Sequence, residues 1–195
     1  MKISSSTLRR LPIYYDYLIS LPATSVNISA TSVAADLRYG DVQVRKDLAS
    51  VSSAGRPRIG YNRIKLIRDM ERFLGYDKVE NIIVITGDEP RLVYGKAIAD
   101  KKLGTKLAAV FSISGNAGGD TISIEELPAF CKSVKVKMCV IDTDASDAAA
   151  AAEVAVKAGI KAIWNLTGAY LNTAENVTVY EDSLSMAVAM LKNKR

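Results

Sequence analysis

The sequence predicts an α/β protein in which a small helical domain, residues 1–78, precedes a parallel-sheet domain, residues 79–195. The first part has helical periodicity and a segment rich in glycine, proline and arginine, whereas the second alternates apolar β-branched runs with helical patterns. Charge divides the chain in the same way. Residues 1–80 hold 13 Lys and Arg against 8 Asp and Glu, and residues 81–195 hold 13 of each.

The chain opens with a predicted helix over residues 6–21. Its apolar positions recur at near-helical spacing and are Leu8, Leu11, Tyr14, Tyr15, Leu18 and Leu21. Pro12 belongs in the first turn or kinks the helix. Ser29 is a suitable cap for a second, short helix over residues 30–37.

A tight turn at residues 38–40 leads to a third helix, residues 42–50, which we expect Asp41 to cap. Val44 and Leu48 point inward in this arrangement, and the outward positions are Gln43, Arg45, Lys46 and Asp47. Two short helices across a glycine-containing turn predict a helix-turn-helix. The second helix of that motif enters the major groove of DNA, where Gln43, Arg45 and Lys46 can contact base edges or phosphates.

Residues 52–61 are a candidate hairpin, and Arg56 and Arg58 make it a basic wing. Arginines on a thin loop can reach the minor groove or the DNA backbone; the alternative is a solvated loop between domains. A fourth helix follows, capped by Asn62 and ended by Gly75. Its expected inward face is Ile64, Ile67, Met70 and Leu74.

The second domain contains five apolar runs expected to be strands: residues 81–86, 106–113, 136–142, 162–166 and 177–180. Helices are predicted over residues 91–102, 146–158 and 183–194. Alternation of strands with helices favours a doubly wound, Rossmann-like parallel sheet.

Several function classes are disfavoured. The sequence has no histidine, so a histidine general base or a histidine metal site is impossible, and we expect no metal and no catalytic residues. Cys131 and Cys139 lack the spacing of a CxxC redox motif or a zinc site and are expected to be buried, reduced thiols, with a redox role as the alternative. No apolar run approaches the roughly 20 residues of a membrane span, so a cytoplasmic protein without membrane contact is expected.

Three runs resemble the redox-sensing transcriptional repressor family Rex. They are residues 10–18 (RLPIYYDYL), residues 43–48 (QVRKDL), and Gly55 with residues 59–61 (IGY); similarity continues through residues 158–165 (AGIKAIWN). The resemblance implies a winged-helix homodimer that binds a palindromic operator and is released from it by NADH. Arg10 and Tyr61 lie in these runs and join the candidate DNA-binding residues. In Rex-like proteins the terminal helix is exchanged between subunits, which makes Leu184, Val188 and Leu191 candidate dimer contacts.

A Rossmann-like sheet binds a dinucleotide through a GxGxxG turn after its first strand. Here residues 87–92 read Gly-Asp-Glu-Pro-Arg-Leu, so only the first glycine is present. Glu89 and Leu92 replace the other two, and Pro90 removes an amide that could donate to phosphate. The acid that normally binds ribose is expected near residues 111–114, where both candidate positions, Ser112 and Ser114, are serines. The candidate NAD(H)-binding residues are therefore Gly87, Arg91 and Ser112. Arg91 is included because its positive charge could compensate the negative charge of Glu89.

Four hypotheses remain open. The protein is a Rex-type repressor responsive to NAD(H), or a Rex paralogue that binds DNA but has lost the dinucleotide and responds to another ligand or to none. A Rossmann-type enzyme is disfavoured because neither a histidine nor a Tyr-x-x-x-Lys pair is present. A CoA- or nucleotide-binding interaction module differs from the first two in predicting no DNA binding.

Overall fold

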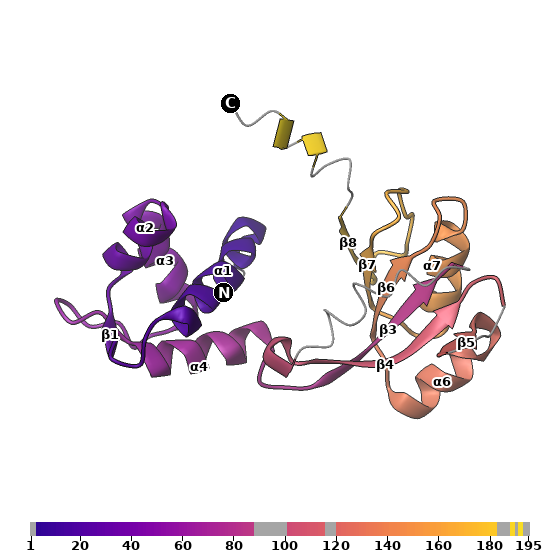
Figure 1. Ribbon diagram of the computed structural model, residues 1–195, viewed down its shortest axis with the longest axis horizontal. Helices are drawn as coiled ribbons and strands as arrows, with labels where there is room; N and C mark the ends of the chain where they lie inside the picture. Colours follow the sequence, from indigo (N-terminus) through magenta and orange to yellow (C-terminus); the bar gives the residue numbers. More distant parts are fainter. Residues whose placement is uncertain (1–2, 88–100, 116–119, 183–187, 190, 193–195) are drawn as a thin grey trace. The chain divides into compact units, whose positions relative to one another are not determined.

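The computed structural model describes residues 3–87, 101–115, 120–182, 188–189 and 191–192. The chain forms two units with the boundary between Asp77 and Lys78. Figure 1 shows helices in the first unit and a sheet with helices in the second.

The first unit contains four helices and a two-stranded sheet (Figure 1). The helices are α1 (Ser5–Ser20), α2 (Ala30–Leu37), α3 (Asp41–Val51) and α4 (Arg63–Leu74). Strands β1 (Asn27–Ile28) and β2 (Tyr61–Asn62) pair antiparallel. The core takes side chains from all four helices, and its fully buried members include Leu11, Tyr14, Leu18, Val33, Val44, Leu48, Leu66 and Met70.

The helix ends follow from local side chains. Ser29 accepts a hydrogen bond from the Ser32 amide at 2.9 Å at the start of α2, and Asn62 accepts from the Lys65 amide at 3.0 Å at the start of α4. Both caps are confirmed. The prediction that Asp41 caps α3 is wrong, because Gly40 occupies the cap position and Asp41 is the first helical residue.

Helix α1 is tied to each of the other three helices by a tyrosine that donates to a carboxylate. The pairs are Tyr14 with Asp47 of α3, Tyr15 with Glu71 of α4, and Tyr17 with Asp36 of α2. Burial, followed by the hydrogen bond to the carboxylate, raises the pKa of each of these tyrosines to about 12. The three hydroxyls therefore fix α1 against the rest of the unit.

Three side chains lie on the opposite side from the one predicted. Leu8 and Ile64 were expected in the core but are 50% and 49% exposed. Asp47 was expected to face outward but is only 4% exposed. Leu8 and Ile64 were misplaced because periodicity determines the buried face of a helix only approximately. Asp47 can be buried because Arg10 and Thr7 of α1 pair with its carboxylate.

The second unit is built on a six-stranded, all-parallel sheet with the order β5-β4-β3-β6-β7-β8. The strands are β3 (Glu80–Thr86), β4 (Thr105–Ser112), β5 (Thr121–Ser123), β6 (Met138–Asp142), β7 (Ala162–Asn165) and β8 (Thr178–Glu181). From β3 the chain moves outward through β4 to β5, then crosses back to β6 on the other side of β3. This is the doubly wound, Rossmann-like order, and it confirms the predicted fold class.

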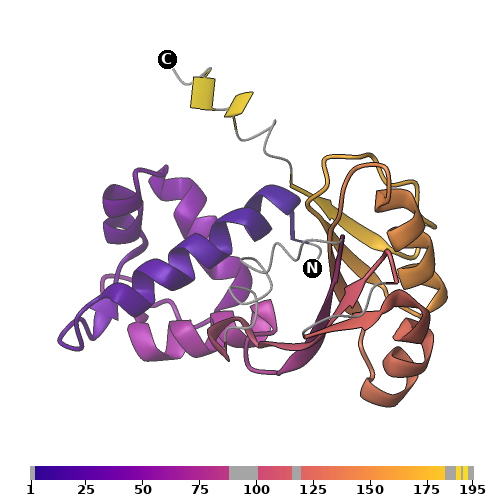
Figure 2. The same ribbon diagram turned by 45° about the vertical axis from the view of Figure 1, so that its right-hand side comes forward.

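Helices α6 (Leu127–Val134) and α7 (Ala148–Lys157) cover one face of this sheet, as Figure 2 shows. Between them and the strands lies a core that includes Ile83, Phe111 and Ile141. Sequence periodicity missed α6 and the three-residue β5. Most of the helix predicted over residues 91–102 lies outside the described residues, as does most of the helix predicted over residues 183–194.

Candidate nucleic-acid interface

Helices α2 and α3 form the helix-turn-helix. Arg38 ends α2 in the left-handed conformation, with φ 57°, and the chain turns through residues 38–40 into α3. Val44 and Leu48 of α3 are buried, which leaves Arg45 and Lys46 exposed on the outer face. The candidate base-reading side chains thus lie in the first two turns of an anchored helix.

A buried ion pair fixes α3 against α1. The Asp47 carboxylate accepts from Arg10 Nε at 2.7 Å and from Arg10 Nη2 at 3.0 Å. Thr7 and Tyr14 donate hydroxyl hydrogen bonds to the same carboxylate, at 2.9 Å and 3.0 Å. Burial alone would raise the pKa of Asp47, but the hydrogen bonds from Arg10, Thr7 and Tyr14 outweigh it and lower the pKa.

Arg10, a predicted DNA-binding residue, therefore forms a salt bridge within the first unit. Its side chain is 16% exposed, and two of its nitrogens bind Asp47. Gln43, turned so that its side-chain oxygen faces Arg10, accepts from the guanidinium at 2.9 Å. Arg10 thus holds both Asp47 and Gln43 of α3.

The wing is a tight hairpin closed by two 2.9 Å hydrogen bonds, exchanged between the backbones of Arg56 and Gly60. Gly60 has φ +81°, and a Cβ there would lie 2.4 Å from the Ile28 carbonyl oxygen of β1. A Cβ on Gly55 would lie 2.7 Å from the Tyr61 ring. Both glycines are needed for this close packing, which brings the wing against the start of α2.

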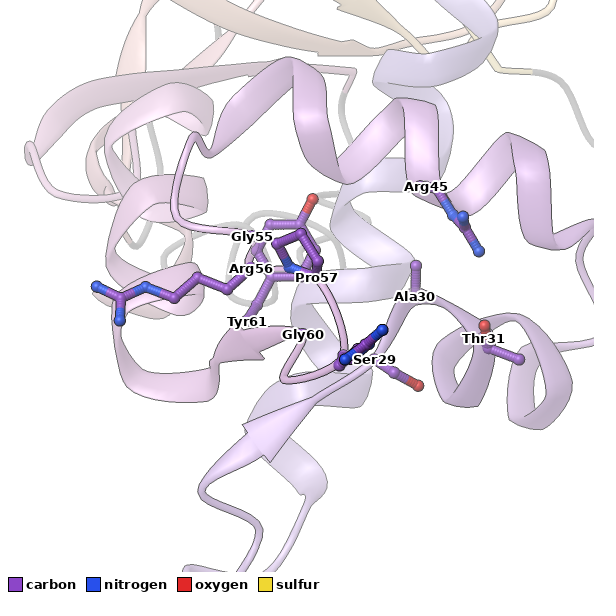
Figure 3. A pocket seen from close by; sticks show the side chains of 10 residues that line it. Ser29, Ala30, Thr31, Arg45, Gly55, Arg56, Pro57, Gly60 and Tyr61 are labelled. Atoms are coloured by element: carbon purple, nitrogen blue, oxygen red, sulfur yellow. The ribbon is translucent and has the colours of Figure 1, made fainter.

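A groove of about 500 Å³ runs between α3 and the wing (Figure 3). Three of its lining residues are arginines, and none is acidic; the lining is Ser29, Ala30, Thr31, Arg45, Gly55, Arg56, Pro57, Arg58, Gly60 and Tyr61. Arg56 and Arg58 are exposed on the wing, whereas Tyr61 is 7% exposed and packs beneath it. Four predicted DNA-binding residues thus line the same basic groove: Arg45 of α3, Arg56 and Arg58 of the wing, and Tyr61 of β2.

Sequence reasoning missed the contribution of α2 to this groove. Ser29, Ala30 and Thr31 form part of its lining, opposite Arg45 in the view of Figure 3. Ser29 was identified as a helix cap but not as a groove residue. The signal was present in the helix-turn-helix prediction, because the start of the first helix of that motif lies close to DNA.

In the second unit the strand order reverses between β3 and β6. In open parallel sheets, ligands generally bind at the carboxyl ends of the strands at such a point. Gly87 follows β3, and a Cβ there would meet nothing within 4 Å among the described residues. Ser112 ends β4, is 2% exposed, and shares a 2.8 Å hydrogen bond with Ser114. The neighbouring Thr86 hydroxyl is buried and has no hydrogen-bond partner among the described residues. Arg91, Glu89, Pro90 and Leu92 lie outside the described residues.

The remaining predicted residues are the candidate dimer contacts near the C-terminus and the two cysteines. Val188 and Leu191 are 38% and 74% exposed, and Leu184 lies outside the described residues. Cys131 and Cys139 are free and buried, and burial raises the pKa of both thiols. In the described part of the chain, no group of three or more Cys, Asp and Glu side chains is arranged to hold a metal ion. None of the described helices is both long and apolar enough to cross a membrane.

Comparisons with known proteins agree with the two-unit architecture. Residues 2–49 match the family described as "Putative DNA-binding protein N-terminus", and residues 77–169 match "CoA binding domain". The crystal structure of RSP in complex with β-NAD⁺ and operator DNA has a TM-score of 0.86 and 27% identity, covering 98% of this chain and 92% of that one. RSP with β-NADH has a TM-score of 0.83 and 26% identity, covering 98% and 93%.

Curated relatives span nearly the same length. The redox-sensing transcriptional repressor Rex of Treponema denticola is 32% identical over 96% of this chain and 93% of its own, and that of Clostridium novyi is 30% identical over 97% and 93%. With this identity over almost its whole length, the chain belongs to the Rex family of redox-sensing, DNA-binding transcriptional repressors.

Proposed function

We propose that this protein represses transcription as a homodimer that binds a palindromic operator, with α3 in the major groove and the wing along the flanking backbone or minor groove. The observation that carries the proposal is the basic groove between α3 and the wing, lined by Arg45, Arg56 and Arg58 and free of acidic lining residues. Phosphate contacts supply much of the affinity for DNA, and arginines in a groove of this kind provide them.

Within this proposal, Arg45 and Lys46 reach bases or phosphates from the exposed face of α3. Gln43 contributes either directly or by its contact with Arg10. Arg10 and Tyr61 act from behind the DNA-facing surface, because one is paired with Asp47 and the other is buried under the wing. Arg56 and Arg58 are exposed and suited to phosphate contacts.

The roles of Arg45 and Lys46 can be separated by titrating each alanine variant with an operator duplex at several salt concentrations. A residue that reads a base costs about 1–3 kcal/mol of specific binding when it is removed. A residue that holds phosphate instead weakens binding to all sequences and reduces the salt slope by about 1. Unchanged binding by both variants would refute the assignment of α3 as the recognition helix.

We further propose that the Rossmann-like unit binds NAD(H) at the carboxyl end of β3, and that NADH releases the protein from the DNA. Among the described residues, a Cβ on Gly87 would meet no atom within 4 Å and the Thr86 hydroxyl at the end of β3 has no partner, which suits close approach of a pyrophosphate. The Ser112 hydroxyl lies at the end of the neighbouring strand β4. The solved complexes of RSP with β-NAD⁺ and with β-NADH support this choice of ligand. No catalytic role is proposed for these residues.

One observation favours a second candidate, a repressor that does not respond to dinucleotides. Glu89 places a carboxylate, and Pro90 removes an amide, in the turn where a pyrophosphate binds. Isothermal calorimetry with NADH and NAD⁺ separates the two candidates. Micromolar or tighter binding supports the redox sensor, and no heat at millimolar ligand supports the second candidate.

The proposed dimer uses the C-terminal segment, with Leu184, Val188 and Leu191 as contacts. The exposure of Val188 and Leu191 on a single chain is consistent with cover by a second copy. Deletion from Ser183 is expected to yield monomers in sedimentation. A persistent dimer would refute this role for the segment.

A further inference from the structure

A carboxylate outside the lining of the basic groove connects two side chains that line it. Asp41, the first residue of α3, accepts a 2.7 Å hydrogen bond from the Thr31 hydroxyl of α2 through one oxygen. Its other oxygen accepts from Arg45 Nη2, also at 2.7 Å. Thr31 and Arg45 both line the groove, and Figure 3 shows their side chains in it. Asp41 therefore links α2 to the candidate base-reading arginine.

Folding stability gives little reason for this contact. The side chains of Arg45 and Asp41 are 65% and 39% exposed, and exposed ion pairs four residues apart on a helix contribute little. At a surface that binds a polyanion, a carboxylate at the start of the recognition helix also weakens the attraction between protein and phosphate. The pair thus stabilises the fold only slightly while opposing nonspecific DNA binding.

We propose that Asp41 is a specificity-determining residue that positions Arg45 for a guanine and disfavours phosphate as its partner; this inference rests on the proposed DNA-binding function. A guanidinium has five N–H donors, so the contact with Asp41 leaves others for the N7 and O6 acceptors of guanine. A phosphate at the same place would meet the negative charge of Asp41. Arg45 then binds well where a guanine is present and poorly elsewhere.

The variant Asp41→Asn tests this directly, because asparagine keeps the size of the side chain and an acceptor for Thr31 while removing the charge. Asp16→Asn is the matched control: it removes one exposed negative charge from α1, outside the groove lining. The probes are a duplex that the wild-type protein enriches from a random-sequence library and a scrambled duplex of the same composition. Affinities for both are measured by fluorescence anisotropy over a series of salt concentrations.

Asp41→Asn is expected to bind the scrambled duplex more tightly, with a salt slope steeper by about 0.9 because Arg45 gains a phosphate contact. The ratio of specific to nonspecific affinity is expected to fall at least about fivefold, the lower end of what one bidentate base contact provides. Asp16→Asn is expected to keep the wild-type ratio. An unchanged ratio in Asp41→Asn, or an equal fall in both variants, would overturn the inference. If the wild-type chain enriches no sequence at all, the proposed DNA-binding function fails, and this inference fails with it.

Discussion

Replacing Asp47 by alanine is expected to destabilise the first unit by about 3 kcal/mol, the lower end of the range for breaking a buried ion pair. The carboxylate is 4% exposed and accepts four hydrogen bonds, two of them from Arg10. The lower end applies because Arg10 is 16% exposed, so water can partly solvate the guanidinium that loses its partner.

Urea unfolding of the full chain can assign this loss to one unit. The single tryptophan, Trp164, lies on β7, so its fluorescence reports on the second unit. Among the described residues, most of the helical ones belong to the four helices of the first unit, so unfolding of that unit changes the helical circular dichroism. The Asp47→Ala variant is expected to lower the midpoint of the dichroism transition by about 1–3 M urea and to leave the fluorescence transition in place.

Asp36→Asn is the control, because Asp36 is exposed and also accepts a tyrosine hydroxyl, that of Tyr17. Its cost is expected to stay below about 1 kcal/mol. The lowered pKa of Asp47 adds a pH signature: its stabilisation is present above the unfolded pKa of about 3.9 and is lost as pH falls through the lower folded value. A loss below about 1 kcal/mol in Asp47→Ala at neutral pH would refute the reasoning.

In urea unfolding, Gly60→Ala is expected to destabilise the first unit by several kcal/mol more than Gly75→Ala. Both glycines have positive φ, but only a Cβ on Gly60 would meet a carbonyl oxygen. Equal losses of stability in the two variants would contradict this. The hydrogen bonds of Tyr14, Tyr15 and Tyr17 are expected to stabilise the first unit below about pH 10, and this stabilisation is expected to be lost as pH rises through about 12. Ionisation of these tyrosines, followed by ultraviolet absorbance, should therefore accompany loss of helical dichroism. Ionisation of these three tyrosines near pH 10 in the folded state would exclude the hydrogen bonds. Burial raises the pKa of the Cys139 thiol, so a thiol reagent is expected to react with it only on unfolding, and rapid modification in buffer would be inconsistent with its place in the core.

Most of the helix positions could be predicted from the sequence, because local signals determine them. Ser29 and Asn62 each cap a helix through their own side chains, and Gly75 ends α4 with φ +77°. The strands β3, β4 and β6 are apolar on both sides, as buried parallel strands are, and their runs are visible without any knowledge of pairing. In these cases the residues adjacent in sequence are sufficient to predict where the helix or strand lies.

What could not be predicted depends on contacts distant in sequence. Asp47 is buried because Thr7, Arg10 and Tyr14 of α1 surround it, and its position on a helical wheel does not reveal those partners. The part of α2 in the groove depends likewise on the packing of the wing against Ile28. Short elements such as β5 were missed because three residues contain too little periodicity to be detected.

The central claim is that the groove between α3 and the wing recognises a particular DNA sequence. Selection from a random duplex library with the purified wild-type protein, followed by sequencing of the bound fraction, tests it most directly. We expect enrichment of one inverted repeat, with half-sites separated by about one helical turn or a multiple of it, as for a two-fold symmetric dimer. A bound fraction with the same sequence composition as the starting library would contradict it.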